Sequence, residues 1–405
     1  MLEIGTDFSG CGAFEQALLR LKIPHRTIFA CDNDKYARET YIKNYGKPGD
    51  FPNDVYERKI PAKPLDIYVA TPPCQSFSMA GKRGGEDDLR GILFYNSHEF
   101  IVKNKPKYFI FENVRGLMSD NKGQTFQTWV DMLGGKSVNG QPVIFPNEDS
   151  VPYHLYYKIM NAKKYGVPQN RERVFLIGIR NDEDNNFHFP VEEPLTKKLA
   201  DILEKDVDPK YDLSEKMLEL LSFNDKVKGV IGDINKGGER GEVFSENSDH
   251  MSCLTATDYK QPKQVLIKTA TKKGYETAQE GDAINFTQAN SKTRRGRVGK
   301  EVSQTIETKI NQGTIVHNIH GGFGETNPRI FEDYSPTIRT AAGGGHIPST
   351  MDNFRIRKLT PRECFRLMDF PDSFTWDVSN TQAYKMAGNS VVVKMYELLI
   401  KKLLS

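Results

Sequence analysis

The chain has 405 residues, more than one domain usually holds, and 38% of them are hydrophobic, enough to bury a core in each of two domains. A net charge of +3 is too small to indicate a polyanionic partner by itself. The five cysteines form no Cys-x-x-Cys pair, which argues against a disulfide framework and a zinc cluster. No run reaches the ~18 apolar residues of a membrane helix, and the strand-like start is not a charged leader. We therefore expect a globular, cytoplasmic protein with no membrane partner and no metal.

Short β-favouring runs alternate with helical patterns over the first 180 residues. The predicted strands are 2–8, 27–32, 65–70, 107–113, 154–161 and 173–180. The predicted helices are 14–21, 34–45, 92–105 and 124–133. This rhythm predicts an α/β fold with a mostly parallel sheet and helices on both faces, in which ligands bind at the carboxyl ends of the strands.

After about residue 183 the sequence becomes charged, Gly-rich and irregular, and helical patterns return only near residue 355. We therefore divide the chain into a first domain at 1–183, a second at 184–354, and a segment at 355–405 that returns to the first. The stretch from 260 to 310 is basic, with eleven Lys and Arg against five Asp and Glu. A faint repeat, "SCLTAT" at 252, "SQTIET" at 303 and "SPTIRT" at 335, marks the second domain; chance similarity of Thr-rich strands is the alternative.

Polar and small residues follow the first three predicted strands. "DFSGCGAF" places glycines where the backbone must turn tightly before a helix, although a plain turn would look the same. Asp32, Asn33 and Asp34 end the second strand, where an acidic side chain suits ribose hydroxyls. Asp54 and Val55 precede the third, as a polar and an apolar neighbour for an adenine. Together they indicate an adenosine-containing ligand, and the lack of a GxGxxG or P-loop pattern argues against NAD or ATP.

Cys74 stands in "VATPPCQSFS", at the end of a central strand and in a Gly-rich loop that runs to Arg90. A nucleophile in that position needs partners, and "FENV" supplies Glu112 and Asn113 at the end of the neighbouring strand. "PQNRERV" supplies Arg171 and Arg173, which share one face if the segment is extended. The alternatives are a buried structural thiol and ordinary surface charge.

With these motifs in place, the chain resembles the DNA (cytosine-5)-methyltransferase family of bacteria and phages. The matches keep the family's order: "DFSGCG", "PPCQSFS", "ENV", "QNRER", a variable segment, "RKLTPRECFRLMDFPDSF" and "GNSVV". Two positions depart from the family's pattern. Thr6 and Asp7 stand where Asp-Leu is more usual, and Asn33 takes a place often held by a large apolar or aromatic residue.

The resemblance implies a Rossmann-like S-adenosylmethionine-dependent domain with a smaller, irregular, β-rich target-recognition domain. The implied reaction transfers a methyl group from S-adenosylmethionine to carbon 5 of a cytosine flipped out of a specific double-stranded DNA sequence. Cys74 would add to carbon 6, Glu112 would bond ring nitrogen 3, and Arg173 would hold the base oxygen with Arg171 beside it. A tRNA cytosine-5 methyltransferase is the alternative, which the some 170 residues between the arginine motif and the last two motifs argue against.

The resemblance also assigns contacts residue by residue. The expected cofactor contacts are Phe8, Gly10, Cys11, Gly12, Asp32, Asn33, Asp54, Val55, Pro72, Leu93, Asn389 and Ser390. The expected DNA contacts are Gln75, Ser78, Lys82, Arg90, Arg294, Arg295, Arg297 and Arg329. We expect a monomer, and the residues leave open whether a cognate restriction endonuclease accompanies it.

Overall fold

The computed structural model describes residues 1–73, 92–183, 186–205, 207–212, 231–233, 242–244, 264–271, 274–279, 281–287, 293, 296–306, 312–317 and 354–405. The chain divides into two compact units. The first consists of Met1–Lys197, Thr305–Lys309 and Cys364–Ser405, and the second of Lys198–Gln304 and Ile310–Glu363. The domain boundaries expected from the sequence stay a prediction.

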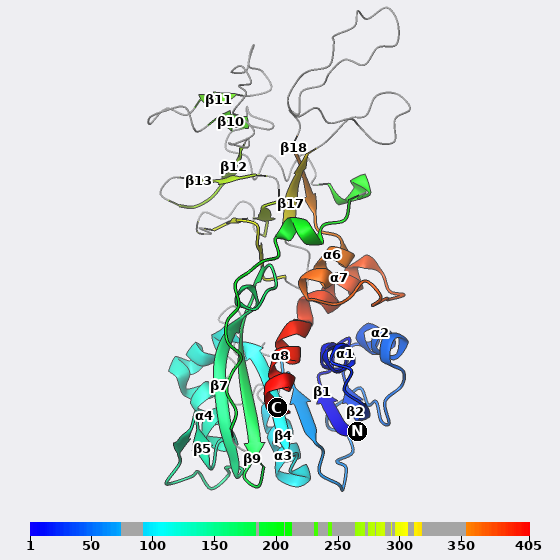
Figure 1. Cartoon of the computed structure of the whole chain (residues 1–405), viewed down its shortest axis with the longest axis vertical. Coiled ribbons are helices and arrows are strands. Elements are labelled where there is room, and N and C mark those ends of the chain that lie inside the picture. The colour runs from blue at the N-terminus through cyan, green and yellow to red at the C-terminus, as the bar shows by residue number, and fades with distance from the viewer. Residues whose placement is uncertain are drawn as a thin grey trace, which may run out of the picture. The chain divides into compact units, whose positions relative to one another are not determined.

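An eight-stranded sheet forms the centre of the first unit (Figure 1). Its strands, in spatial order, are β2 (His25–Cys31), β1 (Leu2–Asp7), β3 (Ile67–Ala70), β4 (Tyr108–Val114), β9 (Glu172–Arg180), β7 (Tyr153–Asn161), β5 (Ser137–Val138) and β6 (Gln141–Pro142). Strands β2, β1, β3 and β4 run parallel, and β9 is antiparallel to β4. The strand order reverses between β1 and β3, which is where such sheets bind ligands.

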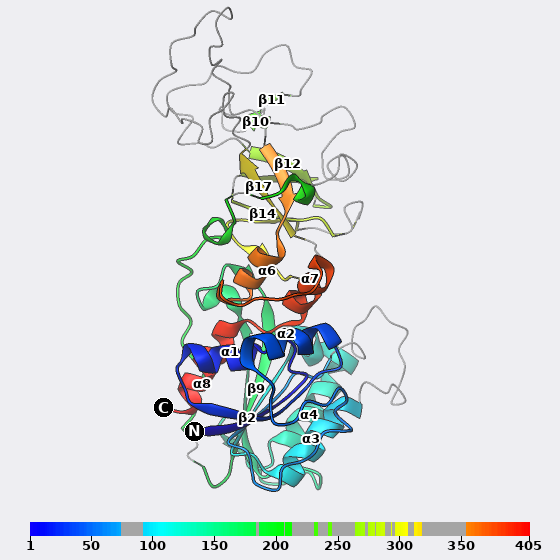
Figure 2. The same cartoon turned by 90° about the vertical axis from the view of Figure 1, so that its right-hand side faces the viewer.

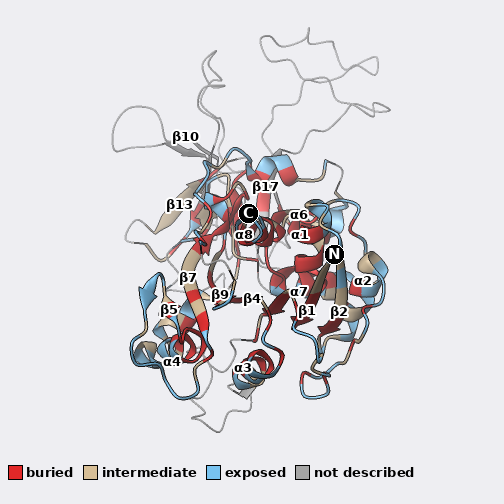
Figure 3. Ribbon diagram, turned by 60° about the horizontal axis from the view of Figure 1, so that its bottom comes forward, coloured by how far each residue is buried: buried red, intermediate tan, exposed pale blue. Residues whose placement is uncertain are grey.

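Helices cover both faces of this sheet (Figure 2). They are α1 (Ala13–Arg20), α2 (Lys35–Tyr45), α3 (Ile92–Asn104), α4 (Gln124–Leu133), α7 (Asn380–Asn389) and α8 (Val393–Leu403). Phe111 of β4 packs against Phe94 and Trp129 of α3 and α4. Phe175 of β9 packs against Tyr396 of α8, which also contacts Phe14 of α1. Consecutive strand residues alternate between these two aromatic layers, so both faces are buried (Figure 3).

Alternation along β4 decides where its polar residue lies. Phe111 belongs to the core cluster on the α3 and α4 face. Glu112 is the next residue, so its side chain leaves the opposite face, the one that α8 covers. The β4–β9 register pairs Glu112 with Phe175, the residue that contacts α8. An acidic side chain is therefore directed toward the carboxyl-terminal helix instead of into the aromatic core.

The second unit contains two antiparallel sheets, each described from its strands. One has the order β11 (Glu242–Phe244), β10 (Ile231–Asp233), β12 (Gln264–Lys268) and β13 (Tyr275–Ala278). The other has the order β15 (Val298–Gly299), β14 (Ala283–Asn285), β17 (Gln312–His317) and β18 (Phe354–Lys358). Further short elements of the chain are β8 (Gln169–Asn170), β16 (Ser303–Gln304), η1 (Arg115–Gly123), η2 (Ala162–Lys164), η3 (Leu199–Ile202) and η4 (Pro209–Tyr211).

The α/β fold class and the small β-rich part are confirmed, and each strand and helix predicted before residue 181 exists with small shifts at its ends. Helical structure returns at Pro361, a few residues after the point near 355 that the sequence pattern predicted. Thr360 caps α6 (Pro361–Leu367): its Oγ1 accepts from Glu363 N at 3.2 Å, and Glu363 Oε2 accepts from Thr360 N at 2.8 Å. None of the described helices is long and apolar enough for a membrane span.

Candidate active site

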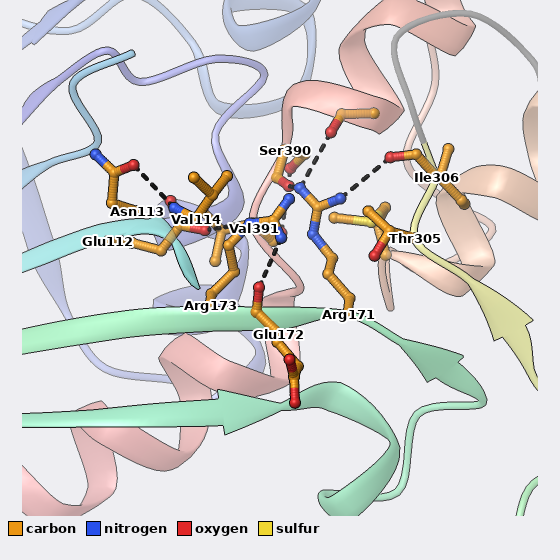
Figure 4. Close-up of polar contacts among 12 residues, drawn as sticks. Glu112, Asn113, Val114, Arg171, Glu172, Arg173, Thr305, Ile306, Ser390 and Val391 are labelled. Carbon is orange, nitrogen blue, oxygen red and sulfur yellow. Dashed lines mark hydrogen bonds and ion pairs between the residues drawn. The ribbon is translucent and has the colours of Figure 1, made fainter. Parts of the chain in front are cut away.

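The antiparallel pairing of β4 and β9 brings Glu112 and Arg173 together. Arg173 lies opposite Val114, and Glu112 lies opposite Phe175, so both polar side chains leave the same face. Arg173 Nε is 3.0 Å from Glu112 Oε1, and Nη1 donates to the Glu172 carbonyl at 2.7 Å (Figure 4). The sequence directed both Arg171 and Arg173 toward the region of Glu112; the structure brings Arg173 to Glu112, and the roles of these residues stay predictions.

The environment of Glu112 favours its protonated form more than water does. Burial raises the pKa of the Glu112 carboxyl, while the charges of Arg173 and Arg171 oppose that shift. The side chains of Glu112 and Arg173 are 9% and 15% exposed, so the pair is largely buried. Glu112 Oε1 is itself buried, and the group that faces it is Arg173 Nε. A carboxyl with a raised pKa beside a guanidinium can supply a proton and hydrogen bonds to a ligand that reaches it.

Asn113 links this pair to the loop that precedes the predicted nucleophile. Its Nδ2 donates to the Pro72 carbonyl at 3.1 Å, and its Oδ1 accepts from Val114 N at 2.8 Å. Pro72 is buried, and Thr71 Oγ1 donates to the Phe8 carbonyl at 3.0 Å. The chain therefore enters the Cys74 loop from a point bonded both to the end of β4 and to the turn after β1. Cys74 lies outside the described residues.

Arg171 does not face Glu112 in the way that Arg173 does. Its guanidinium is buried and donates to three main-chain carbonyls: Ile306 at 3.2 Å, Gly388 at 3.0 Å and Ser390 at 2.8 Å (Figure 4). Burial, and then the charge of Arg173, lower the pKa of Arg171, and Glu112 opposes the shift. Its predicted place beside the base stays a prediction, and these bonds favour a positioning role.

Gln169 makes the same kind of connection two residues earlier. Its Nε2 donates to the Leu367 carbonyl at 2.7 Å, and its Oε1 accepts from Ile306 N at 3.3 Å. Thr305 Oγ1 donates to the Asn170 carbonyl at 3.0 Å. The "QNR" segment thus hydrogen-bonds three stretches of the first unit that are distant in the sequence. These stretches are Thr305–Ile306, Leu367 and Gly388–Ser390.

The turn after β1 has the backbone that its glycines predicted. Phe8, Gly10 and Gly12 have φ of +57°, +54° and +88°. Gly10 N donates to Asp32 Oδ2 at 2.8 Å, which joins this turn to the end of β2. No atom lies within 4 Å of the place where a Cβ on Gly10 would stand, so the turn has open space beside it. Burial raises the pKa of Asp32, and its backbone hydrogen bonds lower it.

The other predicted cofactor residues surround the same strand ends. Asn33 is exposed, Val55 is buried, and Asp54 begins a turn by accepting from Tyr56 N at 3.0 Å. Leu93 is half-buried in the first turn of α3. Asn389, the last residue of α7, is exposed.

The terminal motif returns to the turn after β1. The Ser390 hydroxyl hydrogen-bonds the buried Cys11 thiol, and Lys385 Nζ lies 2.7 Å from Oδ2 of Asp34, the N-cap of α2. Burial raises the pKa of Cys11 to about 12, so this thiol stays protonated. The described cysteines Cys11, Cys31 and Cys364 are all buried, which makes none of them a suitable nucleophile.

Arg297, a predicted DNA contact, is buried. It is 1% exposed, and its Nη1 donates to the carbonyls of Asn285 at 3.2 Å and Thr287 at 3.4 Å. These bonds give the guanidinium a structural role within its own unit, and its DNA contact stays a prediction. The other predicted DNA contacts lie outside the described residues: Gln75, Ser78, Lys82, Arg90, Arg294, Arg295 and Arg329. No cluster that could hold a metal occurs among the residues described.

Sequence reasoning missed a second buried pair, at the carboxyl end of β1. Arg58 Nε lies 3.0 Å from Asp7 Oδ2, and the Tyr68 hydroxyl donates to the same oxygen at 2.6 Å. The Arg58 and Asp7 side chains are 2% and 0% exposed. Asp7 had been noted only as a departure from a pattern, and an arginine 51 positions away offered no periodic signal.

Known proteins resemble this chain over nearly its whole length. The family model described as C-5 cytosine-specific DNA methylase matches residues 6–405. The type II methyltransferase M.HpaII of Haemophilus parainfluenzae is 32% identical over 98% of this chain and 87% of its own length. The orphan methyltransferase M.SPRI of Bacillus phage SPR is 29% identical over 100% of this chain and 97% of its own length.

Solved structures show the same fold. The Dnmt2 methyltransferase of S. pombe aligns with a TM-score of 0.56 at 19% identity, and the alignment covers 100% of this chain and 98% of that one. A putative DNA modification methyltransferase encoded within a prophage of E. coli aligns with a TM-score of 0.52 at 18% identity, covering 100% and 99%.

Proposed function

The chain belongs to the C-5 cytosine-specific DNA methylase family, and from this premise we propose that it methylates a cytosine flipped out of a specific double-stranded sequence, through a covalent bond to Cys74. It is a DNA (cytosine-5-)-methyltransferase that uses S-adenosylmethionine. The observation that carries the proposal is the largely buried Glu112 and Arg173 pair, which Asn113 joins to the start of the Cys74 loop.

The residues at the carboxyl ends of β1 and β2 fit the cofactor. The left-handed turn at Phe8, Gly10 and Gly12 leaves room for a ligand, and Asp32 keeps lone pairs for ribose hydroxyls. Val55 offers an apolar wall and Ser390 closes the turn from the other side. When bound there, S-adenosylmethionine supplies an electrophilic methyl group.

Each protein group has a defined task in the proposed reaction. The Cys74 thiolate adds to carbon 6 of the cytosine, because carbon 5 is too poor a nucleophile until the ring gains electron density. Glu112 gives a proton to ring nitrogen 3, for which its raised pKa prepares it. Arg173 holds the base oxygen and stabilises the charge that develops. After carbon 5 takes the methyl group, water removes the carbon 5 proton, Cys74 leaves as a thiolate, and ring nitrogen 3 returns its proton to Glu112, which restores the ring.

The second unit is the proposed target-recognition part, and the expected DNA contacts at Arg294, Arg295 and Arg329 belong to it. Base-edge contacts set the sequence, and phosphate contacts set the affinity. We also propose that the enzyme acts as a monomer.

The experiment is trapping on duplex DNA amplified with 5-fluorodeoxycytidine in place of deoxycytidine, so that every possible target carries fluorine. Carbon 5 fluorine cannot leave as a proton does, so the wild type with S-adenosylmethionine should form an adduct that survives denaturation. Cys74→Ala should bind S-adenosylmethionine normally, form no adduct and transfer no methyl groups.

Cys31→Ala, which removes a buried thiol, is the matched control and should both trap and methylate. Trapping by Cys74→Ala, or no adduct with active wild type, would overturn the covalent mechanism. Methylation of transcribed tRNA but not of duplex DNA would instead favour the tRNA alternative.

A further inference from the structure

Phe8 is held in a backbone conformation that a non-glycine residue adopts only under constraint. Its φ is +57°, and it is the first residue of the turn proposed to hold the cofactor. Such a conformation persists where the surrounding structure fixes it from both sides. On one side Thr71 Oγ1 donates to the Phe8 carbonyl at 3.0 Å. On the other side stands Asp7, which is wholly buried.

Asp7 is fixed by two partners from different parts of the chain. The Tyr68 hydroxyl of β3 donates to Asp7 Oδ2 at 2.6 Å, and Arg58 Nε lies 3.0 Å from the same oxygen. No described group bonds Oδ1. Two residues before Asp7, strand β1 must have a glycine, because a Cβ on Gly5 would stand 2.3 Å from the Phe29 ring.

Arg58 extends the connection to two further segments. It follows Val55 by three residues, so it ends the turn that carries Asp54 and Val55. Its Nη2 donates to Asn96 Oδ1 of α3 at 2.6 Å. Its guanidinium lies 4.5 Å from the centre of the Phe100 ring, also in α3, a helix that begins beside Leu93. One buried cation thereby touches three of the segments proposed to contact the cofactor.

We propose that Asp7 and Arg58 are positioning residues for the cofactor, which lock the Phe8 turn, the Asp54–Val55 turn and the start of α3 in one arrangement. The inference rests on the proposed cofactor site. Asp7 is one of the two positions at which the first motif departs from the usual Asp-Leu. Neither residue needs to touch the cofactor, because the pair acts through Phe8 and Val55.

The test compares the S-adenosylmethionine affinity of single and double variants, measured by calorimetry on the full chain. Asp7→Asn and Arg58→Met each leave one buried partner unmatched and should weaken binding about tenfold, the scale of losing pre-organisation. Asp7→Leu combined with Arg58→Met replaces the pair with apolar groups and should recover most of the affinity. In methylation assays the single variants should raise KM for S-adenosylmethionine, with kcat at saturation and KM for DNA nearly unchanged.

Two further variants make the outcome decisive. Tyr68→Phe removes only one hydrogen bond to Asp7, so it is expected to fold and to weaken binding severalfold. Asp66→Asn at the other end of β3, where Asp66 pairs with Lys107 at 2.9 Å, is the matched control and should bind normally. Wild-type affinity in folded Asp7→Asn and Tyr68→Phe would overturn the proposal.

Asp32→Asn separates this inference from the proposed site. If Asp32→Asn weakens binding and the Asp7 and Tyr68 variants do not, only the positioning role is wrong. If none of them changes affinity, the proposed cofactor site is wrong and the inference falls with it.

Discussion

Two acid–arginine pairs lie at strand ends of the same sheet, and they differ in access more than in geometry. Glu112 and Arg173 are 3.0 Å apart with side chains 9% and 15% exposed. Asp7 and Arg58 are also 3.0 Å apart, with side chains 0% and 2% exposed. A sealed pair can exchange nothing with a ligand, so its effect must pass through its neighbours. An open pair can donate and accept.

The environments of the two carboxyls reinforce this difference. Burial raises the pKa of both Glu112 and Asp7. In the proposed reaction Glu112 gives its proton to the bound base. For Asp7 a raised pKa of about 6 makes a structural contact sensitive to pH. We propose that similar charge pairs serve proton transfer at one strand end and alignment at the other.

The comparison is tested most strongly by Glu112→Gln. This change keeps the shape and removes the acid, so turnover should fall by roughly 10²-fold or more, the scale of general acid catalysis. S-adenosylmethionine affinity should hardly change. Single-turnover methylation and calorimetry on the same preparation measure the two effects. Near-normal turnover would mean that the open pair is structural as well.

The pH dependence of the sealed pair should have opposite signs for stability and for cofactor binding. The groups facing Asp7 are Arg58, Tyr68 and the Cys31 thiol. Because the folded state raises the Asp7 pKa from 3.8 to about 6, this residue's contribution to the free energy of unfolding falls as pH rises through that range, by about 3 kcal/mol at most.

Cofactor binding should change in the other direction. Below pH 6 Asp7 becomes neutral and the pair is lost, so S-adenosylmethionine affinity should decrease as pH falls. Urea unfolding and calorimetry at several pH values, each compared with the Asp7→Leu, Arg58→Met double variant, isolate the contribution of the pair. Identical pH profiles for the two proteins would contradict this prediction.

The smallest expected effect concerns the proposed phosphate contacts, far from either pair. Alanine at Arg294 or Arg295 should weaken all DNA sequences alike and reduce the salt dependence of binding by about one unit each. Changes within "TIETKINQG" or "TIRTAAGGG" should instead alter which sites are methylated, at a cost of about 1 to 3 kcal/mol for each lost base contact. Methylation maps of both kinds of variant, in protein that still binds cofactor, decide whether recognition lies there.

Local pattern was enough to predict the longer strands and helices before residue 181 and to direct Arg173 toward the region of Glu112. Strand periodicity places residues on faces, and parallel strands bring their carboxyl ends to one edge. It could not predict that Arg171 would bond carbonyls 135, 217 and 219 residues away, or that Arg297 would be buried. Those outcomes depend on which remote segments arrive beside each guanidinium. Helix α7 was also missed, although Ser379 caps it.

The short stretch Thr305–Lys309 belongs to the first unit although the chain on either side belongs to the second. The backbone therefore passes between the units four times, and excision of the second unit by one pair of cuts would remove the carbonyl that Arg171 holds at Ile306. Transplanting the proposed recognition module consequently means splicing two inserts, 198–304 and 310–363, around the short segment Thr305–Lys309. A chimera made with a single insert would exchange specificity and the catalytic scaffold together.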